Sequence, residues 1–149
     1  MKPTAELPRD INAPHADSKL AEFVGRKIVS FDSENGVAEA TFDVPDTFLN
    51  MQGVLHGGAY ATMLDTMCGI AIRTRLDMEK YVGHLTLELK VSYLRAGLPG
   101  KYRGVGSVLR IGKSIAFSQA ELYDADDAQV ARASGTFKLR PRKEEGKDK

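Results

Sequence analysis

The feature that most limits the fold of this chain is one long helical segment with apolar side chains on nearly every face, from Gly57 to Arg75. A helix that is apolar all round belongs in a protein core, because any uncovered face leaves apolar surface in water. The remaining chain must therefore cover a single central helix on most of its sides.

Extended segments make up most of the rest of the sequence. The runs KIVSF and GVAEATFDV flank DSENG, whose Asn35-Gly36 pair supplies the positive φ values that a tight hairpin needs. After Asp77, short turn signals separate four further runs and predict an antiparallel meander: HLTLELKVSYL, YRGVGSVLRI, SIAFSQAELYD and QVARASGTFKL. About six strands can cover one helix only if the sheet curls around it, so the sequence predicts an α+β hotdog fold.

The chain of 149 residues fits one domain with an extension at each end. Residues 1–16 contain three prolines and no apolar period, which indicates a flexible lead-in. The predicted hotdog domain spans 17–140 and begins with a short helix, capped by Asp17 or Ser18 and ended by Gly25. Residues 141–149 alternate in charge without apolar anchors and predict a disordered tail.

Charge and cysteine content argue against several classes of protein. With 21 Lys+Arg against 20 Asp+Glu the formal net charge is +1, so the field that would attract nucleic acid is absent. A single cysteine, Cys68, leaves no internal disulfide, and no signal peptide is visible after Met1. Asp65 and Arg73 interrupt the best apolar run, which falls short of the roughly 20 residues that a bilayer requires. We therefore expect a cytoplasmic protein that binds neither nucleic acid nor a membrane.

Asp65 is the only acidic residue between Asn50 and Ala71. A carboxylate on a buried helix is costly unless it is paired, hydrogen-bonded or open to a cleft. Shortly before it, His56-Gly57-Gly58 stands where a loop meets the helix, and glycines there leave backbone N–H groups open to an oxyanion. The segment is therefore a candidate catalytic site.

Each of these residues also has a purely structural interpretation. Asp65 could face a groove or a subunit interface and merely hold a neighbouring hydroxyl or amide. The glycines could serve a loop-to-helix entry that needs unusual backbone angles. Asn50 could close its own turn, and His56 could satisfy a backbone carbonyl. These residues, taken one at a time, leave both interpretations open.

The separation of Gly57 and Asp65 limits how they can cooperate. At 1.5 Å rise per residue they lie about 12 Å apart along the helix, whereas an oxyanion donor and a base must each lie roughly 3 Å from the reacting groups. One chain cannot easily supply both. Cooperation therefore predicts a two-fold dimer, in which Gly57 of one subunit faces Asp65 of the other at two equivalent sites.

The spacing N-x-x-G-x-x-H-G-G, followed by an acid on the helix, resembles the phenylacetate-degradation-type branch of the hotdog acyl-CoA thioesterases. It is formed here by Asn50, Gly53, His56, Gly57, Gly58 and Asp65. Two later segments fit as well, since LTLELKVSYLRAG is similar to the family's central strand and RIGKSIAFSQAELYD to its G-K/R-S/T hairpin. The resemblance covers about residues 20–139 and departs from the family where Ala96 follows Leu94-Arg95 in place of proline.

The resemblance implies a role for each motif residue. The Gly57 N–H would polarise the thioester carbonyl, and Asn50 would help to position that carbonyl. Asp65 of the other subunit would act as general base for water or as the attacking carboxylate. Thr86 would hold the water or the acid through its hydroxyl, and His56 would orient the loop.

Strand periodicity opposes the role of Thr86. Strict alternation sends Thr86 outward and turns a row of apolar residues toward the helix, namely Leu85, Leu87, Leu89 and Val91. Thr86 can reach the site only through a local twist or a bulge, and its other interpretation is an ordinary β-branched strand residue.

A CoA ester needs contacts for its phosphates, which cations beside open N–H groups can supply. The candidates are Gly58 at the helix start and the turn of Arg110, Gly112, Lys113 and Ser114. Arg95, Lys101 or Arg103 would serve a nucleotide equally well, and basic residues at a hairpin tip are ordinarily just solvated.

No metal or separate cofactor is expected, because CoA is part of the substrate. His15, His56 and His84 are widely spaced and form no metal-binding motif. Cys68 has no cation or histidine near it in sequence, so a packed core thiol is favoured over a nucleophile.

The predicted activity is hydrolysis of acyl-CoA thioesters to a free acid and CoA by a homo-oligomer, with a dimer as the minimal unit and a homotetramer as the expected assembly. Two alternatives remain: a hotdog protein that binds acyl-CoA without turnover, and a hydroxyacyl-thioester dehydratase using His56 and Asp65. The sequence leaves the acyl group undetermined.

Overall fold

The computed structural model describes residues 19–143 and contains one sheet, one long helix and two short helical turns. The elements in chain order are α1 (Lys19–Phe23), β1 (Lys27–Asp32), β2 (Val37–Val44), η1 (Asp46–Phe48), α2 (Gly57–Arg75), β3 (Tyr81–Tyr93), β4 (Gly100–Ile111), β5 (Ile115–Tyr123) and β6 (Gln129–Pro141). The predicted lead-in at 1–16 and the cap at Asp17 or Ser18 lie outside the described residues, as does the tail from residue 144.

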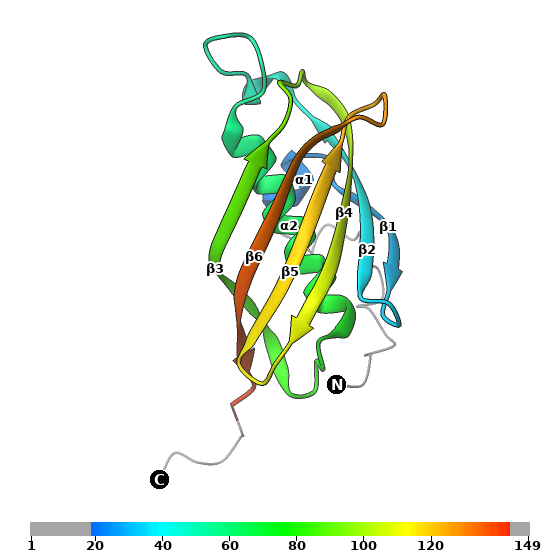
Figure 1. Ribbon diagram of the computed structural model, residues 1–149, viewed down its shortest axis with the longest axis vertical. Helices are drawn as coiled ribbons and strands as arrows, with labels where there is room; N and C mark the ends of the chain where they lie inside the picture. Colours follow the sequence, from blue (N-terminus) through cyan, green and yellow to red (C-terminus); the bar gives the residue numbers. More distant parts are fainter. Residues whose placement is uncertain (1–18, 144–149) are drawn as a thin grey trace.

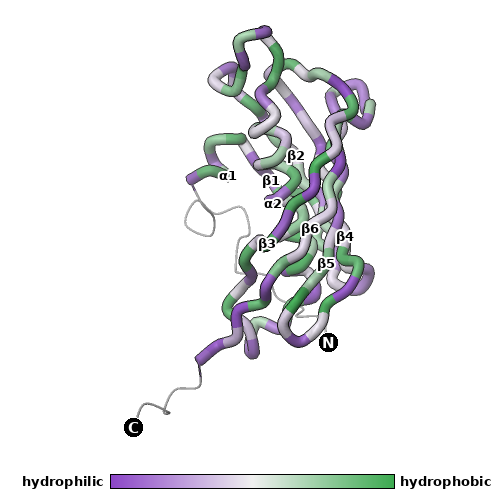
Figure 2. Tube along the Cα trace, turned by 60° about the vertical axis from the view of Figure 1, so that its left-hand side comes forward, coloured by the Kyte–Doolittle hydropathy of each residue, from purple (hydrophilic) through white to green (hydrophobic). Residues whose placement is uncertain are grey.

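A six-stranded antiparallel sheet curves around α2, which confirms the predicted hotdog fold (Figure 1). The strands follow the order β1-β2-β4-β5-β6-β3, so β1 and β3 are the edges. Figure 2 shows hydrophobic and hydrophilic residues alternating along the strands, as expected of a sheet with one face on the core.

The predicted four-strand meander is wrong for its first strand. Of the four strands in that prediction, only β4, β5 and β6 pair with one another in sequence order. The first, β3, pairs with β6. The reason is that β2 occupies one edge of β4, from Val37 opposite Ser107 to Val44 opposite Gly100, while β5 occupies the other. Neither edge of β4 is therefore open to β3, which joins the sheet at β6 instead.

The first hairpin is confirmed, but its turn differs from the prediction. Gly36 has a φ of +72°, whereas Asn35 does not adopt a positive φ. The Asp32 carboxylate instead accepts the N–H groups of Glu34 and Asn35, at 3.0 and 2.9 Å. The turn is therefore a four-residue loop closed by an aspartate rather than a two-residue turn.

Small residues on the inner face of the sheet let it approach α2 closely. Ala38 and Ala40 on β2 and Ala116 and Ala120 on β5 are all buried. Gly106 on β4 lies directly against the Met67 carbonyl, where a side chain would overlap the helix backbone. Met63, Leu64 and Met67 are fully buried, so the apolar face of α2 is core, as predicted.

One stripe of α2 is not covered by the sheet. Thr62, Asp65 and Thr66 are half-buried, in contrast to the fully buried residues on the faces toward β2, β4 and β5. The candidate catalytic carboxylate lies on this open side of the helix.

Candidate active site

A tight loop delivers the chain to the N-terminus of α2. The Asn50 side-chain oxygen accepts the N–H groups of Gln52 and Val54, at 2.9 and 3.3 Å, so Asn50 does close its own turn. Gly53 has a φ of +76°, which explains the glycine in the motif. The amide nitrogen of Asn50 has no hydrogen bond within residues 19–143 and remains available to a ligand.

His56 is the N-cap of α2. Its Nδ1 accepts the Gly58 N–H at 2.8 Å, and its carbonyl accepts the Ala59 N–H at 2.9 Å. As an acceptor, Nδ1 carries no proton, which leaves Nε2 as the protonated nitrogen of the neutral ring. The Gly58 N–H is therefore occupied, and it is not the open donor that the sequence suggested.

Unusual backbone angles do not explain the glycine pair, because neither Gly57 nor Gly58 has a positive φ. A side-chain carbon on Gly58 would lie 3.0 Å from His56 Nδ1, so glycine makes room for the cap. The Gly57 N–H has no hydrogen-bond partner in the part of the chain that the structure describes. It is the open donor at this helix terminus.

Asp65 lies two turns further along α2 and contacts β3. Its Oδ1 accepts a hydrogen bond from the Thr86 hydroxyl at 2.8 Å. The flanking hydroxyls of Thr62 and Thr66 donate to their own helix, to the carbonyls of Gly58 and Thr62, and so do not compete for the carboxylate. Asp65 forms no ion pair within residues 19–143.

A β-bulge brings Thr86 to the helix. Thr86 pairs with Phe137 of β6 and Glu88 with Thr136, which leaves Leu87 as an extra residue. The predicted inward orientation of Leu85 and Leu87 is wrong: they are 52% and 57% exposed. The prediction for Leu89 and Val91 is confirmed, since both pack on the core after the bulge restores their phase.

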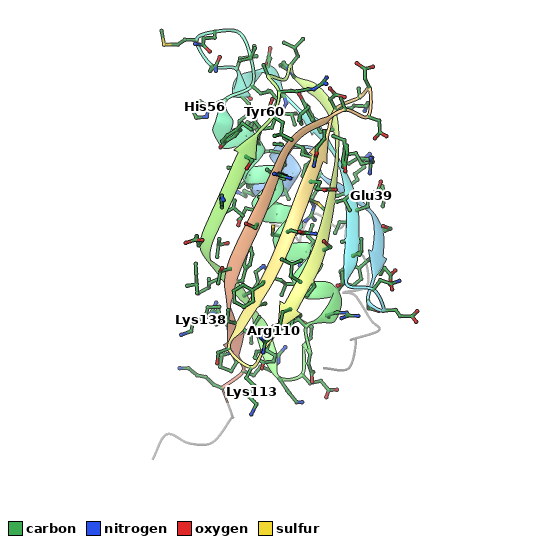
Figure 3. All side chains as sticks on the ribbon, in the orientation of Figure 1. Glu39, His56, Tyr60, Arg110, Lys113 and Lys138 are labelled. Carbon is green, nitrogen blue, oxygen red and sulfur yellow. The ribbon has the colours of Figure 1, made fainter. Side chains whose placement is uncertain are left out.

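The cationic turn lies at the opposite end of the sheet from His56 (Figure 3). Arg110 and Lys113 form no ion pair within residues 19–143, whereas Arg103 is paired with Asp127 at 2.6 Å and Lys101 with Asp43 at 3.8 Å. The Gly112 N–H donates to Ile115 across the hairpin at 2.8 Å, so it is not open to a phosphate, contrary to expectation.

Three residues near these groups were not singled out by the sequence. Lys138 lies beside Arg110 and Lys113 in Figure 3 because β6 pairs with β5, with Lys138 opposite Ile115. Tyr93 contacts Gly57, and His84 packs on Gly69 of α2. Strand pairing and helix contact create these neighbours. Strict alternation of β3 would have placed Tyr93 on the helix side, but it would have sent His84 outward together with Thr86.

His84 of β3 packs on α2 at Gly69, one turn after Asp65. Its ring packs edge-on against Phe137 at 5.5 Å, and its Nδ1 is buried without a hydrogen bond in the described chain. Burial lowers the pKa of His84, and the charge of Arg73 lowers it further, while Asp65 opposes them. The imidazole is therefore held in its neutral form.

Cys68 is a core thiol, as predicted, because it is fully buried on the covered side of α2. Burial raises its pKa to about 11, so the nucleophilic thiolate is disfavoured. Within residues 19–143, no three histidine, cysteine or acidic side chains gather where they could hold a metal ion. None of the helices in that range has the length and apolarity needed to cross a membrane.

Comparison with known proteins places these features in a family. A sequence model of the Thioesterase superfamily matches residues 52–131, more than half of the chain. The medium/long-chain acyl-CoA thioesterase YigI of Salmonella typhimurium is 29% identical over 97 residues, covering 58% of this chain and less than two thirds of YigI, 63%.

Two solved structures share the fold. A phenylacetic acid degradation-related protein from Ralstonia eutropha is 30% identical with a TM-score of 0.76, covering 85% of this chain and 92% of that one. The protein smu.793 from Streptococcus mutans, solved bound to acetyl CoA, is 25% identical with a TM-score of 0.68, covering 80% and 91%. The chain thus belongs to the Thioesterase superfamily and is a thioester hydrolase.

Proposed function

We propose that this protein hydrolyses acyl-CoA thioesters to a free acid and CoA. The observation that carries the proposal is a pair of groups on α2. One is the Gly57 N–H, which has no partner among residues 19–143, and the other is the half-buried Asp65 carboxylate, which is oriented by Thr86. YigI, a medium/long-chain acyl-CoA thioesterase, and smu.793, which was solved bound to acetyl CoA, support CoA esters as the substrate class.

The reaction needs a donor for the developing oxyanion and a base for water. The Gly57 N–H, aligned with the positive end of the α2 dipole, would stabilise the charge on the thioester oxygen. The Asn50 amide nitrogen would help to hold the carbonyl. Asp65 would take a proton from the attacking water; the C–O bond forms, the C–S bond breaks, and the thiolate of CoA leaves. Direct attack by Asp65, through an acyl-enzyme anhydride, is the other route.

A two-fold dimer would bring both groups to one thioester. The open edge of β3 carries the exposed side chains of Leu85 and Leu87, and the uncovered stripe of α2 lies beside it. Antiparallel pairing of two β3 edges would set Gly57 of one subunit toward Asp65 of the partner subunit. The homotetramer and the cytoplasmic location remain predictions.

The same arrangement suggests a place for the CoA phosphates. In one chain, Arg110, Lys113 and Lys138 lie far from the His56 end of the sheet (Figure 3). A two-fold operation would carry the partner's cationic end toward this chain's Gly57 end, so the two subunits would share each substrate. Arg110 and Lys113 are free of ion pairs among residues 19–143 and are thus better candidates than Arg103.

The test is thiol release from hexanoyl, palmitoyl, phenylacetyl and hydroxybenzoyl CoA. Asp65→Asn should lower kcat at least about 1,000-fold, since it removes the base while keeping the shape of the side chain. Asp126→Asn, the same change on an exposed turn outside the site, is the matched control. Size-exclusion chromatography checks that both variants assemble like the wild type.

Each alternative gives a different result. Binding of acyl-CoA without thiol release by the wild type would favour the binding protein. An enoyl product from a hydroxyacyl ester would favour the dehydratase, although His56 Nδ1 is already engaged as the helix cap. Unchanged turnover of Asp65→Asn would overturn the proposed mechanism.

A further inference from the structure

We propose that Tyr93 is a positioning residue that holds the oxyanion donor of Gly57 in place, an inference that rests on the proposed function. Tyr93 is the last residue of β3, and its hydroxyl donates to the Gly57 carbonyl at 3.2 Å. Neither the motif nor the strand pattern assigns it a role.

Tyr93 and His56 form hydrogen bonds with the two polar groups of one peptide unit. The Gly57 carbonyl accepts from Tyr93, and the N–H of the same unit, which belongs to Gly58, donates to His56 at 2.8 Å. A peptide between two glycines is otherwise the most easily rotated link in a backbone. Together with the first turn of α2, the two contacts therefore restrain the orientation of Gly57, whose own N–H has no partner in the described part of the chain.

The ring of Tyr93 also explains why residue 57 is glycine. A side-chain carbon there would lie 3.3 Å from both Cζ and Oη of Tyr93, closer than such atoms ordinarily pack. Gly57 has no positive φ, so backbone strain is not the reason. The methyl group of alanine would therefore require the ring to shift by a few tenths of an ångström relative to the carbonyl to which it donates.

Tyr93 is itself held rigidly. It pairs with Ala131 of β6, and its ring meets Tyr60 edge-on at 5.8 Å. The Tyr60 hydroxyl donates to the Arg95 carbonyl at 3.2 Å, which ties the end of β3 to the first turn of α2. The side chain is still 54% exposed, so it borders the open side of the helix where a substrate would approach.

Tyr93→Phe removes the hydrogen bond and keeps the ring. We expect kcat to fall about 3- to 10-fold with KM unchanged, the effect of one neutral hydrogen bond on the transition state. Because the oxyanion is common to all thioesters, the factor should be equal for hexanoyl and palmitoyl CoA. A loss of kcat that depends on the length of the acyl chain would mean that Tyr93 contacts that chain, and it would overturn the inference.

Tyr102→Phe is the matched control. Its hydroxyl donates to the Leu98 carbonyl at 2.6 Å within the same aromatic cluster but does not contact Gly57. It should lower Tm without changing kcat, which separates positioning from general stability.

The energetic coupling between Gly57 and Tyr93 gives a second, independent test. Gly57→Ala should lower kcat much more in the wild-type background than in Tyr93→Ala, where the methyl group has room. Equal losses in both backgrounds would contradict the inference. The wild type and Asp65→Asn separate the two proposals. If the wild type releases thiol and Tyr93→Phe has the same kcat, only the role of Tyr93 fails. If the wild type releases no thiol from any acyl-CoA, the proposed function fails, whereas an active Asp65→Asn overturns only the mechanism proposed for Asp65.

Discussion

The two sides of α2 use glycine for different purposes. On the covered side, Gly104 and Gly106 of β4 have no side chains because Met67 and its carbonyl occupy the space. On the open side, Gly57 and Gly58 make room for the rings of Tyr93 and His56, which bind their backbone groups. Packing thus fills the space on the covered side. On the open side, the Gly57 N–H has no partner among residues 19–143 and lies on the same helix as the Asp65 carboxylate, two turns before it.

We expect the side of α2 that the sheet covers to tolerate substitutions less well than the open side. Gly106→Val would drive a branched side chain into the Met67 backbone, which cannot rotate away, and we expect the free energy of unfolding to fall by more than about 3 kcal/mol. Ser107→Val adds the same side chain to the outer face and should change stability by less than about 0.5 kcal/mol. Urea denaturation measures both, and similar losses would mean that the contact with α2 is not decisive.

The pH dependence of the free energy of unfolding tests the burial of Cys68 on the covered side of α2. The unfolded thiol loses its proton near pH 9.0, while the folded thiol keeps it up to about 11. The free energy of unfolding should therefore fall as pH rises through this range, by up to about 3 kcal/mol, and less steeply in Cys68→Ala. Parallel curves between pH 8 and 10.5 would show that burial does not shift this pKa.

Thr86 tests the open side without altering the core. Thr86→Val keeps the shape of the side chain but removes the hydrogen bond to Asp65, so kcat should fall about 10-fold while Tm changes little. Thr136→Val on the neighbouring strand is the control and should keep wild-type kcat. If Thr86→Val has the wild-type kcat, the hydrogen bond between Thr86 and Asp65 has only a structural role.

His84 lies where the two sides meet and should give the smallest effect. Its pKa is lowered in the folded protein, so below pH 6.5 the unfolded chain binds a proton that the folded chain resists. The free energy of unfolding should consequently decrease as pH falls from 6.5. Thermal melts between pH 7 and 5 should show a weaker decrease in His84→Gln, and an identical decrease would mean that His84 does not couple to folding.

Much of the fold followed from local pattern. The apolar run of 57–75 predicts the buried helix, and the strand runs match the observed strands to within a few residues. Pairing did not follow, because β2 and β5 occupy both edges of β4 and β3 pairs with β6. That competition involves segments far apart in the sequence.

The candidate site also combines residues that the sequence singled out with contacts that only the structure revealed. The motif singled out Asn50, His56, Gly57 and Asp65 as candidates, because glycines and a lone acid at a helix start are visible in a single segment. Only the tertiary structure decided that Thr86 reaches Asp65, since a bulge at Leu87 reverses the strand alternation. Likewise, the contact of Tyr93 with Gly57 depends on how β3 runs beside α2.

The sequence by itself determined that one apolar helix is wrapped by strands and begins with a glycine pair, because hydrophobic period and glycine placement are local properties. The tertiary structure decided which side of that helix stays uncovered and which side chains orient its polar groups. Those outcomes depend on strand order and register, which are set by the packing of the whole sheet rather than by any one segment.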